Sequence, residues 1–142
     1  MKIFEALRKD HDKQRALIKV LIGTTGDSQI RQEYFTQLKA ELESHAAAEE
    51  RHFYAPLMQS DKTIKLSRHG VAEHHQIDEL IAQLNSTDMS TAAWLAHFKE
   101  LAEKIEHHLA EEEREFFQQA GKVLSESDKE KLANDYVTEM DA

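Results

Sequence analysis

Cysteine is absent from this sequence of 142 residues, which also has only one proline and four glycines. Without cysteine the chain has no disulfide framework, no thiolate metal site and no cysteine nucleophile. All-β folds need glycine and proline at their many turns, so this composition argues against an all-β fold. The sequence also lacks any apolar run of the about 18 residues that a membrane-spanning helix needs. We therefore expect a helical protein without a membrane partner.

Basic residues are outnumbered, 18 against 27 acidic residues, which gives a formal net charge of −9. Nucleic acid requires a basic binding face, so we expect no nucleic-acid partner. Charged side chains run through residues 1–23, which excludes a signal peptide there and indicates a cytoplasmic location by default. Apolar residues make up 40% and charged residues 32%, a balance typical of a globular domain. The one unusual abundance is that of histidine, with nine residues.

Short turn signals separate long segments with helical periodicity. Apolar residues recur at positions i, i+3, i+4 and i+7 in four such segments, at residues 3–22, 28–58, 62–84 and 90–120. Short connections make consecutive helices antiparallel neighbours, so we predict an all-α, antiparallel up-down-up-down four-helix bundle over residues 1–122. Ser125 begins a capping motif for a short C-terminal fifth helix within residues 123–142. We assign that helix no chemical role.

An internal repeat relates the two halves of this bundle. A shift of 63 residues aligns residues 3–59 with 66–122, and 14 of the 57 aligned pairs are identical. The identical pairs include polar residues as well as core residues: His11/His74, His45/His108 and Glu49/Glu112. The sequence therefore predicts two similar helical hairpins related by a pseudo-two-fold axis.

The repeated polar residues interrupt the apolar stripe of each helix. The same 34 residues separate His11 from His45 and His74 from His108, which places these side chains at similar heights along the bundle. We predict that six side chains face the interior in one layer: His11, His45, Glu49, His74, His108 and Glu112. Unpaired charges in a protein core cost several kcal/mol, so such a layer requires a partner.

Two metal ions satisfy this layer. Imidazole and carboxylate groups suit iron, manganese or zinc, and a carboxylate can bridge two ions. The simplest symmetric assignment gives His11 and His45 to one ion and His74 and His108 to the other, with both glutamates as bridges. Octahedral iron would keep two further positions, one for a shared oxo or hydroxo bridge and one for O2, NO or peroxide.

Several nearby side chains have alternative interpretations. Asp78 lies one turn after His74 and is either an extra ligand, a hydrogen-bond partner of the site or an exposed residue. His75 is the alternative to His74 as a ligand but is expected on the solvated face beside Glu79. Other polar residues are expected at the surface or at the rim: His52, His69, His97, His107, Glu111 and Glu113. Tyr34 and Tyr54 either donate to the site or, as we expect, pack at the edge of the core.

These residues resemble the hemerythrin-like, or HHE cation-binding, family. The similarity covers about residues 3–120 and includes His11 and the segments His45–Pro56, Glu73–Asp78 and His108–Phe117. It implies a four-helix bundle with a non-haem di-iron centre held by the six predicted ligands. The symmetric set of four histidines resembles the bacterial members that are linked to oxidative or nitrosative stress and to iron handling.

Two other functions remain as alternatives. A ferritin-like di-metal oxidase would use an E-x-x-H motif, which Glu49 and His52 provide once, whereas Glu115 replaces the histidine in the second half. A metal-free bundle would hold the six residues in a hydrogen-bond network and serve as an acidic interaction module. Carriage, sensing and turnover would use the same ligands, so the sequence assigns no particular enzymatic activity.

Overall fold

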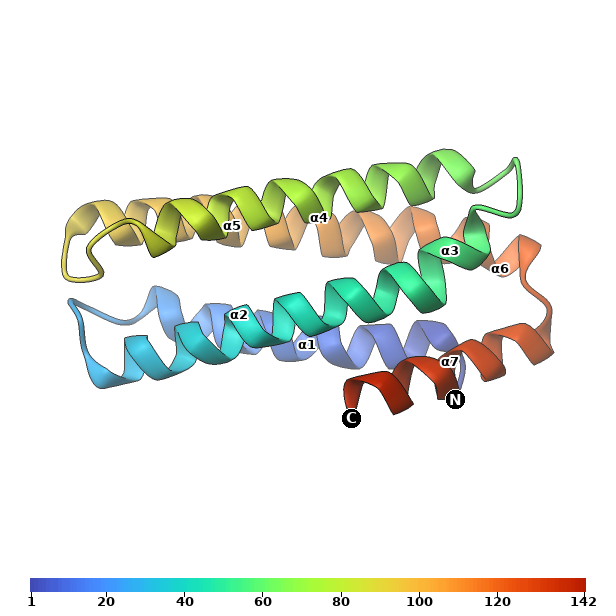
Figure 1. The fold of residues 1–142 in the computed structure, drawn as a ribbon, viewed down its shortest axis with the longest axis horizontal. Coiled ribbons are helices and arrows are strands. Elements are labelled where there is room, and N and C mark those ends of the chain that lie inside the picture. The colour runs from blue at the N-terminus through green and yellow to red at the C-terminus, as the bar shows by residue number, and fades with distance from the viewer.

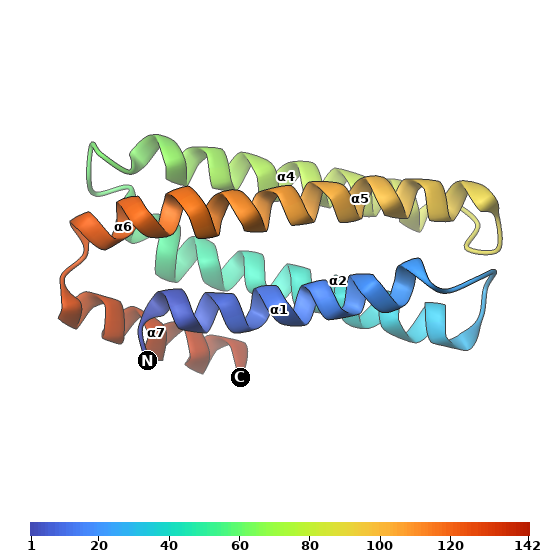
Figure 2. The ribbon, with the colours of Figure 1, turned by 180° about the vertical axis from the view of Figure 1, so that it is seen from behind.

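The computed structural model describes all 142 residues and contains helices but no strands (Figure 1). The four long helices are α1 (Ile3–Ile22), α2 (Gln29–Glu49), α4 (Ile64–Asn85) and α5 (Ala92–Glu111). They run alternately up and down and lie side by side along most of their length (Figures 1 and 2). The predicted fold class, an antiparallel four-helix bundle with a short fifth helix, is confirmed. None of these helices combines the length and the apolar character that crossing a bilayer requires.

Side-chain caps mark the starts of three helices. The Ser28 hydroxyl accepts a hydrogen bond from the backbone nitrogen of Arg31 at the start of α2, and Thr91 does the same for α5. Ser125 and Asp128 form a reciprocal capping box at the start of α7 (Glu126–Met140). The fifth helix thus begins where its capping motif predicts.

Helices α2 and α5 each continue through a π-helical turn. In the first hairpin η1 (Glu50–Tyr54) leads into α3 (Ala55–Leu57), and in the second η2 (Glu112–Phe116) leads into α6 (Phe117–Val123). A π turn inserts one extra residue into the helix and occurs frequently at functional sites. Periodicity predicts uninterrupted helices here, so these two turns are a feature that the structure adds.

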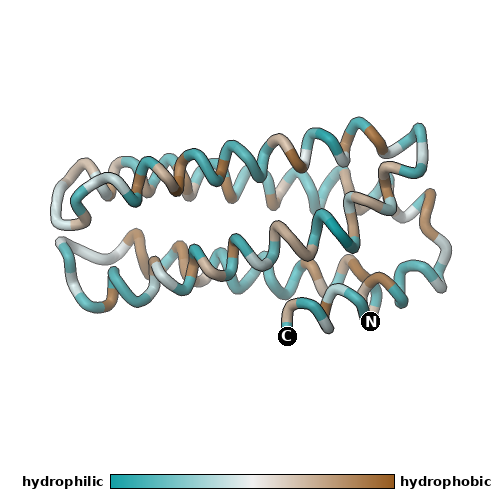
Figure 3. Tube along the Cα trace, in the orientation of Figure 1, coloured by the Kyte–Doolittle hydropathy of each residue, from teal (hydrophilic) through white to brown (hydrophobic).

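The core consists of two apolar clusters with a polar layer between them. One cluster, with Leu21, Phe35 and Phe98, fills the end near the loops that connect α1 to α2 and α4 to α5. The other cluster, with Leu7 and Phe53, fills the opposite end. Apolar segments recur at helical intervals along all four helices (Figure 3). The buried histidines and glutamates lie where the two clusters meet.

Helix α7 packs along α1 and α2 beside the N-terminus (Figure 2). It buries Ala133 and Tyr136, both 1% exposed, in the second apolar cluster. Tyr136 also reaches the polar layer, where its hydroxyl lies 2.5 Å from Nδ1 of His45. The C-terminal helix therefore contacts the chemical site, although the sequence pattern gives it no such role.

Candidate metal centre

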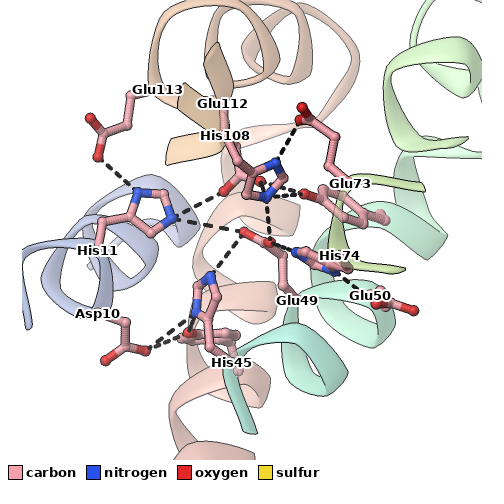
Figure 4. A network of polar contacts seen from close by, with 12 residues as sticks. Asp10, His11, His45, Glu49, Glu50, Glu73, His74, His108, Glu112 and Glu113 are labelled. Atoms are coloured by element: carbon pink, nitrogen blue, oxygen red, sulfur yellow. Dashed lines mark hydrogen bonds and ion pairs between the residues drawn. The ribbon is translucent and has the colours of Figure 1, made fainter. Parts of the chain in front are cut away.

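The six predicted ligands meet in one buried layer (Figure 4). Each is at most 6% exposed: His11, His45, Glu49, His74, His108 and Glu112. The histidines come from four different helices, and the four-residue spacing of His45 to Glu49 places both side chains on one face. His108 and Glu112 have the same spacing on α5 and the start of η2. The structure thus brings together all six residues that the repeat singles out.

Four of the side chains form a first group of donor atoms. Nε2 of His11 lies 3.1 Å from Oε1 of Glu112 and 4.0 Å from Oε2 of Glu49. Nε2 of His45 lies 3.4 Å from the same oxygen of Glu49. One donor atom from each of the four residues lies within 4.8 Å of the others.

A second group forms on the other side of the two carboxylates. Nε2 of His74 lies 3.0 Å from Oε1 of Glu49. Nε2 of His108 lies 3.5 Å from Oε2 of Glu112 and 3.9 Å from Oε1 of Glu49. Each carboxylate therefore turns one oxygen toward each pair of imidazoles, which is the arrangement that two bridging carboxylates require.

Most of these donor atoms are buried without a hydrogen-bond partner. They are Nε2 of His11, His45 and His74, both oxygens of Glu49, and Oε1 of Glu112. They lie close together, but none is in hydrogen-bonding geometry with another. Native proteins leave few buried polar atoms unsatisfied, because each costs about 1–3 kcal/mol. Converging imidazole nitrogens and carboxylate oxygens are the donor set that iron, manganese and zinc accept, so these residues fit metal ions.

The outer nitrogens of three histidines are fixed by carboxylates. Nδ1 lies 2.8 Å from a carboxylate oxygen in each of three pairs, namely His11 with Glu113, His74 with Glu50 and His108 with Glu73. A proton on Nδ1 that is donated to a carboxylate leaves Nε2 free to bind a metal. These pairs hold the rings with Nε2 toward the centre (Figure 4).

The fourth histidine, His45, has a different partner. Its Nδ1 lies 2.5 Å from the hydroxyl of Tyr136 and 3.9 Å from Oδ2 of Asp10, to which that hydroxyl donates a hydrogen bond. Asp10 corresponds to Glu73 under the 63-residue shift but is one methylene shorter. Tyr136 fills the gap that the shorter side chain leaves.

Tyr54 makes the two halves of the site unequal. Its hydroxyl donates a short hydrogen bond to Oε2 of Glu112 and lies 3.4 Å from Nε2 of His108. Burial, together with the Glu112 and Glu49 carboxylates, raises the pKa of Tyr54 well above its usual value, so the hydroxyl keeps its proton. The corresponding residue in the other half is Phe117, which has no hydroxyl. Of the two roles that the sequence leaves open for Tyr54, the structure shows donation to Glu112 and not packing at the edge of the core alone.

The charged groups of the layer shift one another's pKa values. Burial lowers the pKa of each imidazole, but the surrounding carboxylates outweigh it and raise the pKa to about 11 at His11, about 9 at His45 and His74, and about 10 at His108. Burial raises the pKa of Glu49, and the imidazoles around it, His45 first, outweigh that effect and lower it well below 4.5. Burial and the Glu49 charge raise the pKa of Glu112. In the absence of metal the layer therefore binds protons between its carboxylates.

The alternative residues lie outside this layer. Asp78 is exposed and makes no hydrogen bond or ion pair with the six side chains, but it lines a small cavity next to His74. The side chain of His75 is 75% exposed and pairs with Glu79 at 3.1 Å, as expected for the solvated face. His107 is also largely exposed and pairs with Glu111. His52 lies 3.0 Å from Glu139 on α7 and not against Glu49.

Sequence reasoning missed the residues that orient the ligands. Glu113 is wrongly expected on a solvated face, because it bonds with His11 and with the guanidinium of Arg15. A signal for these residues exists in the same repeat, since the 63-residue shift pairs Asp10 with Glu73 and Glu50 with Glu113. Tyr136 lies outside the repeat, so only the packing of α7 reveals it.

Comparisons with known proteins identify the family and the fold. The hemerythrin HHE cation binding domain matches residues 2–120. A protein named DNA nickase from Nostoc sp. (strain PCC 7120 / SAG 25.82 / UTEX 2576) is 28% identical over 136 residues, which make up 96% of this chain but only 38% of that relative. A crystal structure of a hemerythrin HHE cation binding domain-containing protein from Mycobacterium kansasii has the same fold, with a TM-score of 0.90 at 23% identity. It covers 99% of this chain and 86% of that one. With its match over residues 2–120, the chain belongs to the hemerythrin HHE cation-binding domain family.

Proposed function

We propose that this protein holds two iron ions side by side in the buried layer, as a non-haem di-iron centre. His11 and His45 would bind one ion, His74 and His108 the other, and Glu49 and Glu112 would bridge them. The observation that carries this proposal is the set of six buried donor atoms that converge without hydrogen-bond partners. Manganese or zinc would suit the same donors, so the identity of the metal is itself a subject of the test.

When bound, a pair of iron ions would supply a positively charged, redox-active centre that binds or reacts with O2, NO or peroxide. The residues of the chain determine which molecules reach it. A small cavity, part of it open to solvent, adjoins His45, His74 and His108. Its other walls include Leu42, Ile77, Ile105 and Leu109, so its space suits small molecules. We propose a role in binding or reacting with such molecules, or in iron handling, under oxidative or nitrosative stress.

Two structural details favour this function over the alternatives. A ferritin-like oxidase would need His52 beside Glu49, whereas His52 is turned toward Glu139. A metal-free hydrogen-bond network would need Nε2 of the histidines in hydrogen-bonding geometry with the glutamates. None of the four meets this requirement, since the one partner of Nε2 of His108 is the Tyr54 hydroxyl. We do not extend the proposal to DNA, because a formal net charge of −9 opposes binding of a phosphate backbone.

The decisive experiment combines metal quantification with absorption spectroscopy on the aerobically purified chain. We expect close to two iron equivalents per chain after iron loading, and an oxo-bridged di-ferric spectrum that changes on addition of azide. Fewer than about 0.5 metal equivalents after careful loading with iron, manganese or zinc would contradict the di-metal site.

Neighbouring histidines provide matched controls for the ligands. His108→Ala and His74→Ala remove proposed ligands and are expected to lose most of the bound metal. His107→Ala and His75→Ala remove exposed histidines one residue away and should retain it. Metal loss in His52→Ala but not in His11→Ala would favour the ferritin-like arrangement instead.

A further inference from the structure

Two polar side chains in the cavity beside the proposed centre have no role in holding the ligands, namely Asp78, which is exposed, and Gln14, which is buried. Gln14 lies on α1, three residues after His11, and lines the same cavity as His45, His74 and His108. The same cavity is lined by apolar side chains such as Leu42 and Ile105. Gln14 is the one amide side chain among its lining residues.

The amide nitrogen of Gln14 has no hydrogen-bond partner. Gln14 is 1% exposed, and its Nε2 is one of the few buried side-chain nitrogens without an acceptor. A buried donor without an acceptor destabilises the folded chain, and an apolar residue of similar shape avoids that cost. Gln14 thus carries a structural penalty that packing alone does not explain.

The internal repeat shows that packing does not need an amide here. The 63-residue shift pairs Gln14 with Ile77, and both residues line this cavity, Gln14 from α1 and Ile77 from α4. The second half of the bundle therefore meets the cavity with an apolar side chain at the equivalent position. The first half has an amide side chain there instead.

We propose that Gln14 donates a hydrogen bond to a small anion bound in this cavity at the metal centre, and so selects anionic ligands over neutral ones. This inference rests on the proposed di-metal function. The ligand class is a diatomic or triatomic anion, such as a reduced oxygen species or azide, whose outer atom accepts a hydrogen bond. The cavity has room for about one water-sized molecule and is partly open to solvent, which limits the ligand to a few atoms. A neutral ligand with a weak acceptor atom gains little from the same amide.

Azide binding to the iron-loaded full-length chain tests this proposal. Gln14→Leu keeps the approximate shape of the side chain and removes the donor, and we expect its azide affinity in the di-ferric form to fall about tenfold, the effect of one hydrogen bond to a charged group. NO affinity in the di-ferrous form should change less than about threefold. Gln76→Leu, which replaces an exposed glutamine on α4, is the matched control and should leave both affinities unchanged.

Two further readouts separate a ligand-binding role from a structural one. The metal-free Gln14→Leu chain should melt a few degrees higher than the wild-type chain, because an unsatisfied buried donor has been removed. Gln14→Glu, which is similar in shape, should bind azide more weakly still because its carboxylate repels the anion. Unchanged azide affinity in these variants, or an equal loss for azide and NO, would overturn the proposal. Failure of the wild-type chain to bind metal would instead overturn the proposed function.

Discussion

Gly70 on α4 lies against the ring of Tyr54, so close that a β-carbon at this position would be 2.6 Å from the tyrosine hydroxyl oxygen and 2.7 Å from Cε2. The absence of a side chain at Gly70 allows Tyr54 to extend past α4 and donate to Glu112. A glycine in the middle of a helix costs about 1 kcal/mol relative to alanine, so a specific packing reason for it is expected. The hydrogen bond of Tyr54 to a bridging carboxylate supplies that reason.

This contact predicts that Gly70→Ala destabilises the chain despite the better helix propensity of alanine. The added methyl group must displace the Tyr54 ring, and overpacking of this kind typically costs about 1–3 kcal/mol. Gly121→Ala in α6 is the control, because nothing lies within 4 Å of the added β-carbon. That substitution should stabilise the chain by up to about 1 kcal/mol. Urea unfolding of both metal-free variants measures the two effects, and equal stabilisation would contradict the packing argument.

The different lengths of Asp10 and Glu73 lead to a second prediction. Tyr136→Phe removes the hydroxyl that connects His45 to Asp10, and loss of such a hydrogen bond to a metal-binding histidine typically lowers metal affinity by about 10–100-fold. Asp10→Glu introduced together with Tyr136→Phe should restore much of the affinity, because the longer carboxylate reaches His45 as Glu73 reaches His108. Chelator competition measures the affinities. Wild-type affinity in Tyr136→Phe would show that α7 does not support the site.

The carboxylate behind His11 gives a third prediction. Burial raises the pKa of Glu113, but hydrogen bonds from His11 and Arg15 outweigh burial and lower it to about 2, so the group is ionised at neutral pH. Glu113→Gln keeps an acceptor for His11 but removes the charge, and we expect the affinity of the His11 site for metal to fall about tenfold. Glu115→Gln is the control, since Glu115 is exposed and its one ion pair, with Arg114, is 3.8 Å long. Similar affinities in the two variants would contradict a role for the Glu113 charge.

These partners show how far the sequence predicts the site. Residues whose chemistry repeats in both halves, such as His45 and His108, stand out because a polar side chain interrupts an apolar stripe twice at the same place. Glu50 and Glu113 repeat as well, but they lie at the boundary of the apolar stripe. At that position the sequence pattern does not distinguish a carboxylate that faces solvent from one that accepts a hydrogen bond from a histidine. Both residues lie in the π-helical turns. The spacing of apolar residues does not predict where a helix changes from α-helical to π-helical hydrogen bonding.

The residues that break the repeat are the least predictable. Tyr54 corresponds to Phe117 and Gln14 to Ile77, so each differs from a partner of similar size by one polar group. The role of each polar group depends on an atom of another helix or on a cavity, neither of which the local sequence shows. Tyr136 depends on where a separate helix docks. Such relationships arise from tertiary packing, which overrides the local pattern from which the four helices could be predicted.

The shifted imidazole pKa values predict how pH changes the stability of the metal-free chain. The four histidines titrate at about 9 to 11 in the folded chain and near 6.5 when unfolded, so the folded state binds more protons between these values. Their contribution to the free energy of unfolding is complete below pH 6.5 and is lost as the pH rises through 9 to 11.

The contribution of the carboxylates to stability changes with pH in the opposite direction. They determine where the stability of the metal-free chain is lost at low pH. The pKa values of Glu73 and Glu113 are both lowered to about 2, so the stability that they contribute is present above pH 4.5 and is lost as the pH falls toward 2. Urea unfolding of the chelator-treated chain should therefore show greatest stability between about pH 4.5 and 6.5. Bound metal competes with the same protons, so the iron-loaded chain should hold its stability to higher pH. A metal-free chain as stable at pH 10 as at pH 6 would contradict protonated imidazoles between the carboxylates.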